Sequence, residues 1–169
     1  MDMGDKVEIL SCDIHPHKLK LIENGALRLG LHSIRTALAD GSESHAAWIG
    51  QADLVVADVP CSGLGIIRKK PDIRYKEPKE LKKLPEIQRA ILENAATYVC
   101  SGGMLVYSTC TVLPEENEEV TRDFLSRHEE FELVPFVLPM PIGRTDGNLT
   151  LWPQRYGTDG FYICRMRRK

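Results

Sequence analysis

The chain has 169 residues and a formal net charge of −2, with 43% hydrophobic and 27% charged residues. This size and mixture fit one domain with its own core and exclude a disordered, collagen-like or coiled-coil chain. The near-neutral charge gives no global positive field, so a nucleic acid would have to be met by a local patch. No apolar run approaches the ~18 residues of a membrane span, and we expect a cytoplasmic protein without a membrane contact.

Short apolar runs alternate with helical spacing along the chain, which is typical of β-α units around a mostly parallel sheet. The patterns predict strands at 7–12, 33–38, 53–59, 104–109, 133–137 and 160–166, and helices at 16–30, 84–98 and 114–127. The run 53–59 is apolar between two acids, as expected of a strand covered on both faces. We therefore predict an open α/β sheet of about six strands, with ligands at the carboxyl ends of the strands.

Two charged segments stand out against the neutral total. Residues 68–83 carry eight basic and three acidic residues, and they belong to a long irregular loop over 60–83. Loops of this length in compact domains are usually functional, so phosphate contact and a solvated surface are equally open for it. Residues 115–132 carry eight acids and two arginines. For this run we favour a solvated helix face, with its first acids suited to the helix dipole.

Three predicted strands end in an acid at the edge where a ligand is expected: Asp13, Asp40 and Asp58. Such carboxylates can bind a ribose diol or an adenine amino group in a nucleotide-binding sheet. Each also has a local explanation. Asp13 can cap the following helix, Asp40 can form a turn with Gly41, and Asp58 can pair with a lysine. Their repetition at successive strand ends favours the ligand site.

The five cysteines, at positions 12, 61, 100, 110 and 164, are odd in number and include no Cys-x-x-Cys pair. This argues against a disulfide framework and a zinc site, and we expect no metal. We interpret Cys12, Cys100 and Cys164 as small core residues, since each lies in an apolar run. Cys61 and Cys110 instead follow strands beside polar and turn residues, where basic neighbours would favour a reactive thiolate.

Two thiols beside a nucleotide-like site suit one particular chemistry. Carbon 5 of cytosine is a poor nucleophile, but a thiolate added to carbon 6 turns the ring into an enamine that can attack an electrophilic methyl group. A base must then remove the proton on carbon 5 before the thiol leaves. A nucleophile and a second group that assists release would both be required.

Several segments together resemble the RNA cytosine-5 methyltransferases of the Sun (Fmu, RsmB) family, over nearly the whole chain. The segments are Asp13 to Lys18, Asp58 to Gly65, Pro71 to Arg74, Tyr107 to Asn117 and Asp159 to Tyr162. The paired Pro-Cys and Thr-Cys segments in this order are the most specific of them. The resemblance implies a Rossmann-like class I methyltransferase sheet, S-adenosylmethionine as methyl donor and small-subunit ribosomal RNA as substrate, with the target cytosine unpaired or flipped.

The same resemblance assigns roles to single residues. It implies that Cys110 attacks carbon 6, that Cys61 assists release of the product and that Asp58 lies between the base and the donor. Asp13 would bind the donor's ribose and Asp40 would lie near its adenine. For contact with RNA phosphates we name the basic side chains at the start of the loop: Arg68, Lys69, Lys70 and Arg74.

The chain departs from this family in one respect. Such proteins carry a first strand and a glycine-rich turn N-terminal to the Asp13 strand, and Gly63-Leu64-Gly65 lacks the third glycine of such a turn and follows the wrong strand. We therefore expect residues 1–169 to form a single truncated catalytic domain without the family's N-terminal RNA-binding region. The missing strand would expose two sheet edges, which a preceding segment or a homo-oligomer would cover, and the donor would bind weakly.

Two other functions remain open from the sequence. A DNA cytosine-5 methyltransferase also uses a Pro-Cys thiol, but it would not need the Thr-Cys segment that contains Cys110. A non-catalytic RNA-binding remnant of such an enzyme would bind RNA through residues 68–83 without forming covalent adducts.

Overall fold

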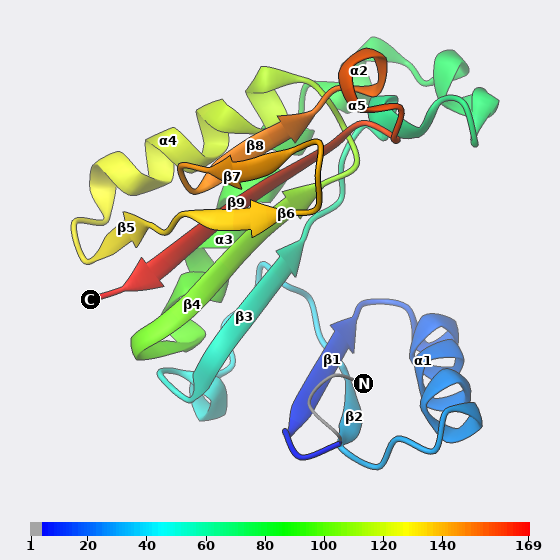
Figure 1. Cartoon of the computed structure of the whole chain (residues 1–169). Helices are drawn as coiled ribbons and strands as arrows, with labels where there is room; N and C mark the ends of the chain where they lie inside the picture. The colour runs from blue at the N-terminus through cyan, green and yellow to red at the C-terminus, as the bar shows by residue number, and fades with distance from the viewer. Residues whose placement is uncertain (1–4) are drawn as a thin grey trace. The chain divides into compact units, whose positions relative to one another are not determined.

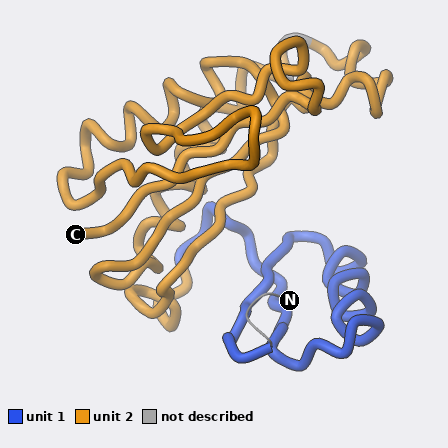
Figure 2. The backbone as a smooth tube through the Cα atoms, in the orientation of Figure 1, with its two compact units in different colours: residues 1–44 blue, residues 45–169 orange. Residues whose placement is uncertain are grey.

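In the computed structural model, which describes residues 5–169, the chain divides into two units, one up to Ser44 and one from His45 onward (Figure 2). In the first unit a parallel strand pair is connected by a helix: β1 (Ile9–Asp13), α1 (Pro16–Arg28) and β2 (Ile34–Leu38). Pro16 occupies the first turn of α1, where its missing N–H costs nothing. Gly30 follows the helix with a φ of 66°, so the predicted start and end of this helix are confirmed.

The second unit is built on a five-stranded mixed sheet (Figure 1). Its strands are β3 (Ala52–Asp58), β4 (Val99–Thr109), β9 (Phe161–Arg168), β5 (Phe131–Leu133) and β8 (Asn148–Leu151). The order is β3-β4-β9-β5, and β8 also pairs with β9. β3 and β4 run parallel, whereas β9 is antiparallel to β4, β5 and β8. A short hairpin of β6 (Phe136–Leu138) and β7 (Gly143–Thr145) follows β5.

Two long helices, α3 (Leu84–Tyr98) and α4 (Glu118–Arg127), cover one face of this sheet. The remaining helices are short: η1 (Ala46–Trp48), η2 (Leu64–Ile66), η3 (Pro71–Tyr75), α2 (Pro78–Leu81), η4 (Pro114–Glu116) and α5 (Pro153–Tyr156). The core contains alternate residues of β4 and β9, such as Leu105 and Tyr162. They pack against residues of both long helices, such as Leu92 of α3 and Phe124 of α4. Alternation with period two directs these strand side chains to one face.

The opposite face of β3 is open within the second unit. Leu54 and Val56 are 52% and 60% exposed, while Ala57 points into the core. Among the described residues β3 pairs only with β4, so it is an edge strand. The prediction that 53–59 is covered on both faces is therefore wrong for this chain, because the helices of the unit lie against one side only.

Other differences concern short elements and two cysteines. The predicted strand 133–137 is broken into β5 and β6, and the stretch 139–157 contains β7, β8 and α5. Cys164 is buried as predicted, but Cys12 is exposed and Cys100 is half-buried, so neither is a core thiol. Their strands have an open face in their own units, which an apolar sequence pattern does not reveal. None of the helices described over residues 5–169 has both the length and the apolar character that a membrane span requires.

Candidate active site

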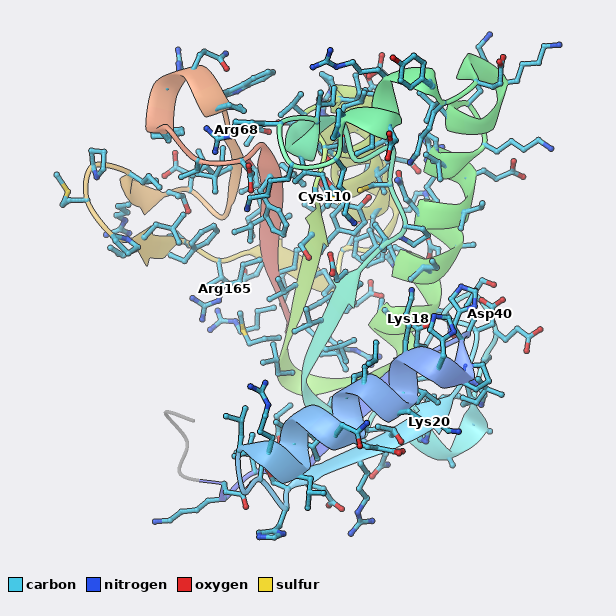
Figure 3. All side chains as sticks on the ribbon, turned by 90° about the vertical axis from the view of Figure 1, so that its right-hand side faces the viewer. Lys18, Lys20, Asp40, Arg68, Cys110 and Arg165 are labelled. Atoms are coloured by element: carbon cyan, nitrogen blue, oxygen red, sulfur yellow. The ribbon has the colours of Figure 1, made fainter. Side chains whose placement is uncertain are left out.

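The two cysteines that follow β3 and β4 lie together. The parallel register of β3 and β4 places Asp58 beside Ser108. Cys61 follows Asp58 by three residues, and Cys110 follows Ser108 by two. The Cys61 and Cys110 Sγ atoms are 3.2 Å apart, and the Cys110 N–H donates to the Cys61 Sγ at 3.3 Å. Figure 3 shows Cys110 and Arg68 at the same end of the second unit. Two thiols that are 49 residues apart in the sequence therefore form one pair.

The pair has one acidic and one weakly acidic thiol. The hydrogen bond from Cys61 lowers the pKa of Cys110 to about 7, against the opposing effects of burial and of the Asp58 carboxylate. The same hydrogen bond, together with burial, raises the pKa of Cys61 well above that of an ordinary thiol. Near neutral pH the arrangement thus favours a thiolate on Cys110 and a protonated thiol on Cys61. The Cys61 S–H then donates a hydrogen bond to the Cys110 thiolate.

Asp58 presents a carboxylate at the same edge. It is the last residue of β3, its side chain is exposed, and it accepts a hydrogen bond from the Ser108 Oγ at 3.2 Å. Its negative charge is close enough to oppose ionisation of Cys110. The structure therefore brings together all three of the residues predicted for this edge, one carboxylate and two thiols.

Side chains that the sequence reasoning missed hold the backbone around Cys61. Glu116 Oε2 accepts the Ser62 N–H at 2.9 Å, and the Lys76 Nζ donates to the Ser62 carbonyl at 2.9 Å. The Gln88 Nε2 donates to the Pro60 carbonyl at 2.9 Å. Lys76 lies in the same loop as Cys61, whereas Glu116 and Gln88 are 54 and 28 residues from their backbone partners. No local pattern could reveal these contacts, because the fold alone brings the partners together.

A close crossing of two glycines fixes the other side of the pair. The Gly65 N–H donates to the Cys110 carbonyl at 3.0 Å, and the Gly160 N–H donates to the Gly65 carbonyl at 2.8 Å. A Cβ on Gly65 would lie 2.1 Å from the Gly160 carbonyl oxygen, so only glycine fits there. The loop after β3, the residue after β4 and the residue before β9 are thereby joined through backbone atoms.

The loop that follows Cys61 carries several cationic side chains. Arg68 and Lys69 form ion pairs with Asp159, whose two carboxylate oxygens lie 3.5 and 2.5 Å from their nitrogens. Lys70 and Arg74 are exposed, and Lys70 favours ionisation of Cys110. The four basic residues predicted for phosphate contact are all exposed on the loop that follows Cys61.

Asp13 is the last residue of β1, and Asp40 lies two residues after β2, in the first unit. Asp13 Oδ1 accepts the His15 N–H at 2.8 Å, and the Lys18 Nζ lies 3.3 Å from Oδ2. Partial burial opposes ionisation, but these partners outweigh it and hold the pKa of Asp13 below its usual value. Asp40 Oδ1 accepts from both the Oγ and the N–H of Ser42, which lowers its pKa. The turn foreseen at Asp40 is thus present, whereas the cap foreseen for Asp13 is not, because the N-cap residue of α1 is His15 and no side chain caps this helix.

A thiolate next to a protonated thiol and a carboxylate can perform covalent catalysis. The thiolate can add to an electron-poor carbon, and the neighbouring thiol can exchange a proton with the adduct. Among the described residues no group of three His, Cys, Asp or Glu side chains is arranged to hold a metal ion. The site thus offers nucleophilic and acid–base groups.

The sequence profile of the 16S rRNA methyltransferase RsmB/F family matches residues 1–167. The chain belongs to this family. It is 41% identical to the probable ribosomal RNA small subunit methyltransferase B of Bacillus subtilis (strain 168), over 99% of this chain and 39% of the relative. It is 32% identical to ribosomal RNA small subunit methyltransferase F of Cronobacter sakazakii, over 95% of this chain and 35% of that protein. This RsmB/F chain therefore spans about two fifths of the length of these relatives.

Solved structures confirm the α/β fold of class I methyltransferases. The crystal structure of PH0851 matches with a TM-score of 0.90 and 32% identity, over 98% of this RsmB/F chain and 38% of that one. NSun6 from Pyrococcus horikoshii, solved with SFG, matches with a TM-score of 0.78 and 28% identity, over 97% and 42% of the two chains. The predicted Rossmann-like fold class is confirmed by these likenesses.

Proposed function

We propose that this RsmB/F chain is the catalytic part of an enzyme that methylates carbon 5 of a cytosine in small-subunit ribosomal RNA. The single observation that carries the proposal is the Cys61–Cys110 pair, with its sulfur atoms 3.2 Å apart beside the Asp58 carboxylate. A methyltransferase that acts on nitrogen needs no such pair, because a nitrogen lone pair attacks the methyl group directly. Activation of an unreactive ring carbon needs a nucleophile and a second acid–base group.

In the proposed reaction Cys110 is the nucleophile. Its thiolate forms a bond to carbon 6, and the electron pair displaced from the 5,6 double bond makes carbon 5 nucleophilic. Carbon 5 then takes the methyl group that S-adenosylmethionine supplies. Loss of the proton on carbon 5 restores the double bond and expels the Cys110 thiolate. A pKa of about 7 keeps much of Cys110 ionised at neutral pH and also makes it a good leaving group.

Cys61 is the group that assists release. While Cys110 is a thiolate, its charge and hydrogen bond hold the proton on Cys61. Once the Cys110 sulfur is bonded to carbon 6, the charge that held this proton is gone. Cys61 can then pass its proton to solvent, and the resulting Cys61 thiolate accepts the proton from carbon 5 as the Cys110–carbon 6 bond breaks. Asp58 faces the same space and lies between the base and the methyl donor in this proposal.

The donor and the RNA use the other predicted residues. Asp13 and Asp40 lie at the carboxyl ends of parallel strands, where carboxylates can accept from ribose hydroxyls and from an adenine amino group. The Lys18 partner of Asp13 is half-exposed and can yield to such a ligand. SFG, present in the NSun6 structure, is an analogue of S-adenosylmethionine, which supports this choice of donor. Arg68, Lys69, Lys70 and Arg74 would contact RNA phosphates.

The experiment completes the chain to the length of its relatives, using the N-terminal part of the Bacillus subtilis protein, and supplies cytosine-containing RNA with S-adenosylmethionine. Cys110→Ala should abolish methylation and leave no covalent adduct. Cys61→Ala should methylate but accumulate a covalent RNA complex that resists denaturing electrophoresis. Cys100→Ala is the matched control and should behave as the parent. Methylation that survives Cys110→Ala would overturn the proposal, and RNA binding without any adduct would favour the non-catalytic remnant.

A further inference from the structure

Glu116 is the exception in the acidic segment. The run 115–132 is predicted to be a solvated face, and Glu115, Glu119 and Glu129 are indeed exposed. Glu116, however, is only 1% exposed, so the prediction is wrong at this residue. It is the last residue of η4, the short helix after the Thr-Cys segment, and its side chain points into the protein.

The buried carboxyl group of Glu116 contacts the loop that carries Cys61. Its Oε2 accepts the Ser62 N–H at 2.9 Å and the Gln88 Nε2 at 2.8 Å, and the same Gln88 nitrogen donates to the Pro60 carbonyl at 2.9 Å. The residues before and after Cys61 are therefore both fixed by one carboxylate, either directly or through one amide.

Further buried contacts hold the backbone that carries this carboxyl group. The Tyr107 hydroxyl donates to the Glu116 backbone carbonyl at 2.6 Å, and Gln88, which donates to the carboxyl group, is fully buried. Among the described residues, Glu116 Oε1 and Gln88 Oε1 have no hydrogen-bond partner. Burial of a carboxyl group and two unpartnered oxygens is costly, and an apolar side chain of similar volume would be expected to stabilise the core better. Stability alone does not explain this residue.

We propose that Glu116 is a positioning residue that sets the Cys61 thiol against Cys110. Its carboxylate fixes the backbone on both sides of Cys61, so that the two sulfur atoms stand 3.2 Å apart. Its catalytic consequence rests on the proposed function, because it concerns the step that uses Cys61. The placement of the thiols does not depend on RNA or on the methyl donor, and it can be measured by itself.

The first experiment measures how readily the two thiols join in the 169-residue chain. Diamide oxidises two thiols to a disulfide and is itself reduced to the hydrazine, and peptide mapping by mass spectrometry follows the Cys61–Cys110 bond. Glu116→Leu keeps the volume and removes both acceptors, whereas Glu116→Gln keeps one acceptor oxygen. Glu115→Leu is the matched control on an exposed neighbour. Circular dichroism and thermal melting report whether each variant is folded.

We expect the disulfide to form about tenfold to a hundredfold more slowly in Glu116→Leu, since a displacement on the order of 1 Å has effects of this size on reacting groups. Glu116→Gln should restore most of the rate, and Glu115→Leu should match the parent. A folded Glu116→Leu with a rate within twofold of the parent would overturn the proposal. If Glu116→Leu does not fold, the same rate is measured in Gln88→Met, which removes the donor to the Pro60 carbonyl. A slower disulfide then supports the proposal, and a rate within twofold of the parent overturns it.

The second experiment uses the completed enzyme with RNA. Glu116→Leu should form the covalent RNA complex but release the product slowly, as expected for Cys61→Ala, and Glu116→Gln should recover release. Slow disulfide formation with normal release would mean that Glu116 positions Cys61 but that Cys61 does not act as proposed. Normal disulfide formation would contradict the positioning role whatever the RNA experiment shows.

Discussion

The carboxylates of the first unit and the thiols of the second are held in opposite ways. Asp13 and Asp40 are bonded to N–H groups only two residues away, on exposed turns. Cys61 contacts Cys110, and the next residue, Ser62, is bonded to the buried Glu116, which is 54 residues away in the sequence. A site built from local turns tolerates the loss of one contact, whereas a site built from distant contacts depends on the whole fold around it.

The largest expected effect of a single substitution is at the glycine crossing of the second unit. Gly65→Ala would place a Cβ 2.1 Å from the Gly160 carbonyl oxygen and 2.8 Å from the Cys110 carbonyl oxygen. Both are backbone atoms that cannot turn away, so the loop and the strand end must separate. We expect a loss of about 1–3 kcal/mol in the free energy of unfolding, measured in urea. The loss of the Gly65–Cys110 hydrogen bond should also expose Cys110 to alkylation.

Local patterns predicted the long helices in both units, and α3 has the predicted bounds 84–98. Pro16 and Gly30 fixed the ends of α1, and the turn at Asp40-Gly41 was expected from its residue types. The thiol pair followed from the resemblance and from the parallel strands. Burial of Glu116 was missed, since its partners Ser62 and Gln88 are 54 and 28 residues away. Sequence spacing carries information about neighbours on one element, but not about which distant backbone group a side chain will reach.

Removal of one thiol tests how strongly the two members of the pair depend on each other. In the parent chain, alkylation of Cys110 by iodoacetamide should be half-maximal near pH 7, since the thiolate reacts and its fraction rises as the pH passes the pKa. In Cys61→Ala the hydrogen bond that lowers this pKa is gone. The midpoint should move up toward the ordinary thiol value of about 8.5.

Peptide mapping separates Cys110 from the other cysteines in this experiment, and buried Cys164 serves as an internal reference that should stay unmodified. Cys61→Ser retains a hydroxyl donor and should give an intermediate midpoint. If the midpoint stays near 7 in Cys61→Ala, then Lys70 and the Cys110 backbone, rather than the partner thiol, set the acidity of the nucleophile.

The smallest expected effect is in the first unit, at the glycine inside α1. A Cβ on Gly25 would meet no atom within 4 Å, in contrast to Gly65. Alanine also loses less backbone entropy than glycine when a helix forms, so Gly25→Ala should stabilise α1 by about 0.5–1 kcal/mol. Hydrogen–deuterium exchange of the α1 amides should slow by a factor that corresponds to this energy, while the amides of α3 and β4 keep their rates. Slower exchange in both units would show that they unfold together. The local contacts of the first unit and the distant contacts of the second would then differ in geometry only, because the two units would share one stability.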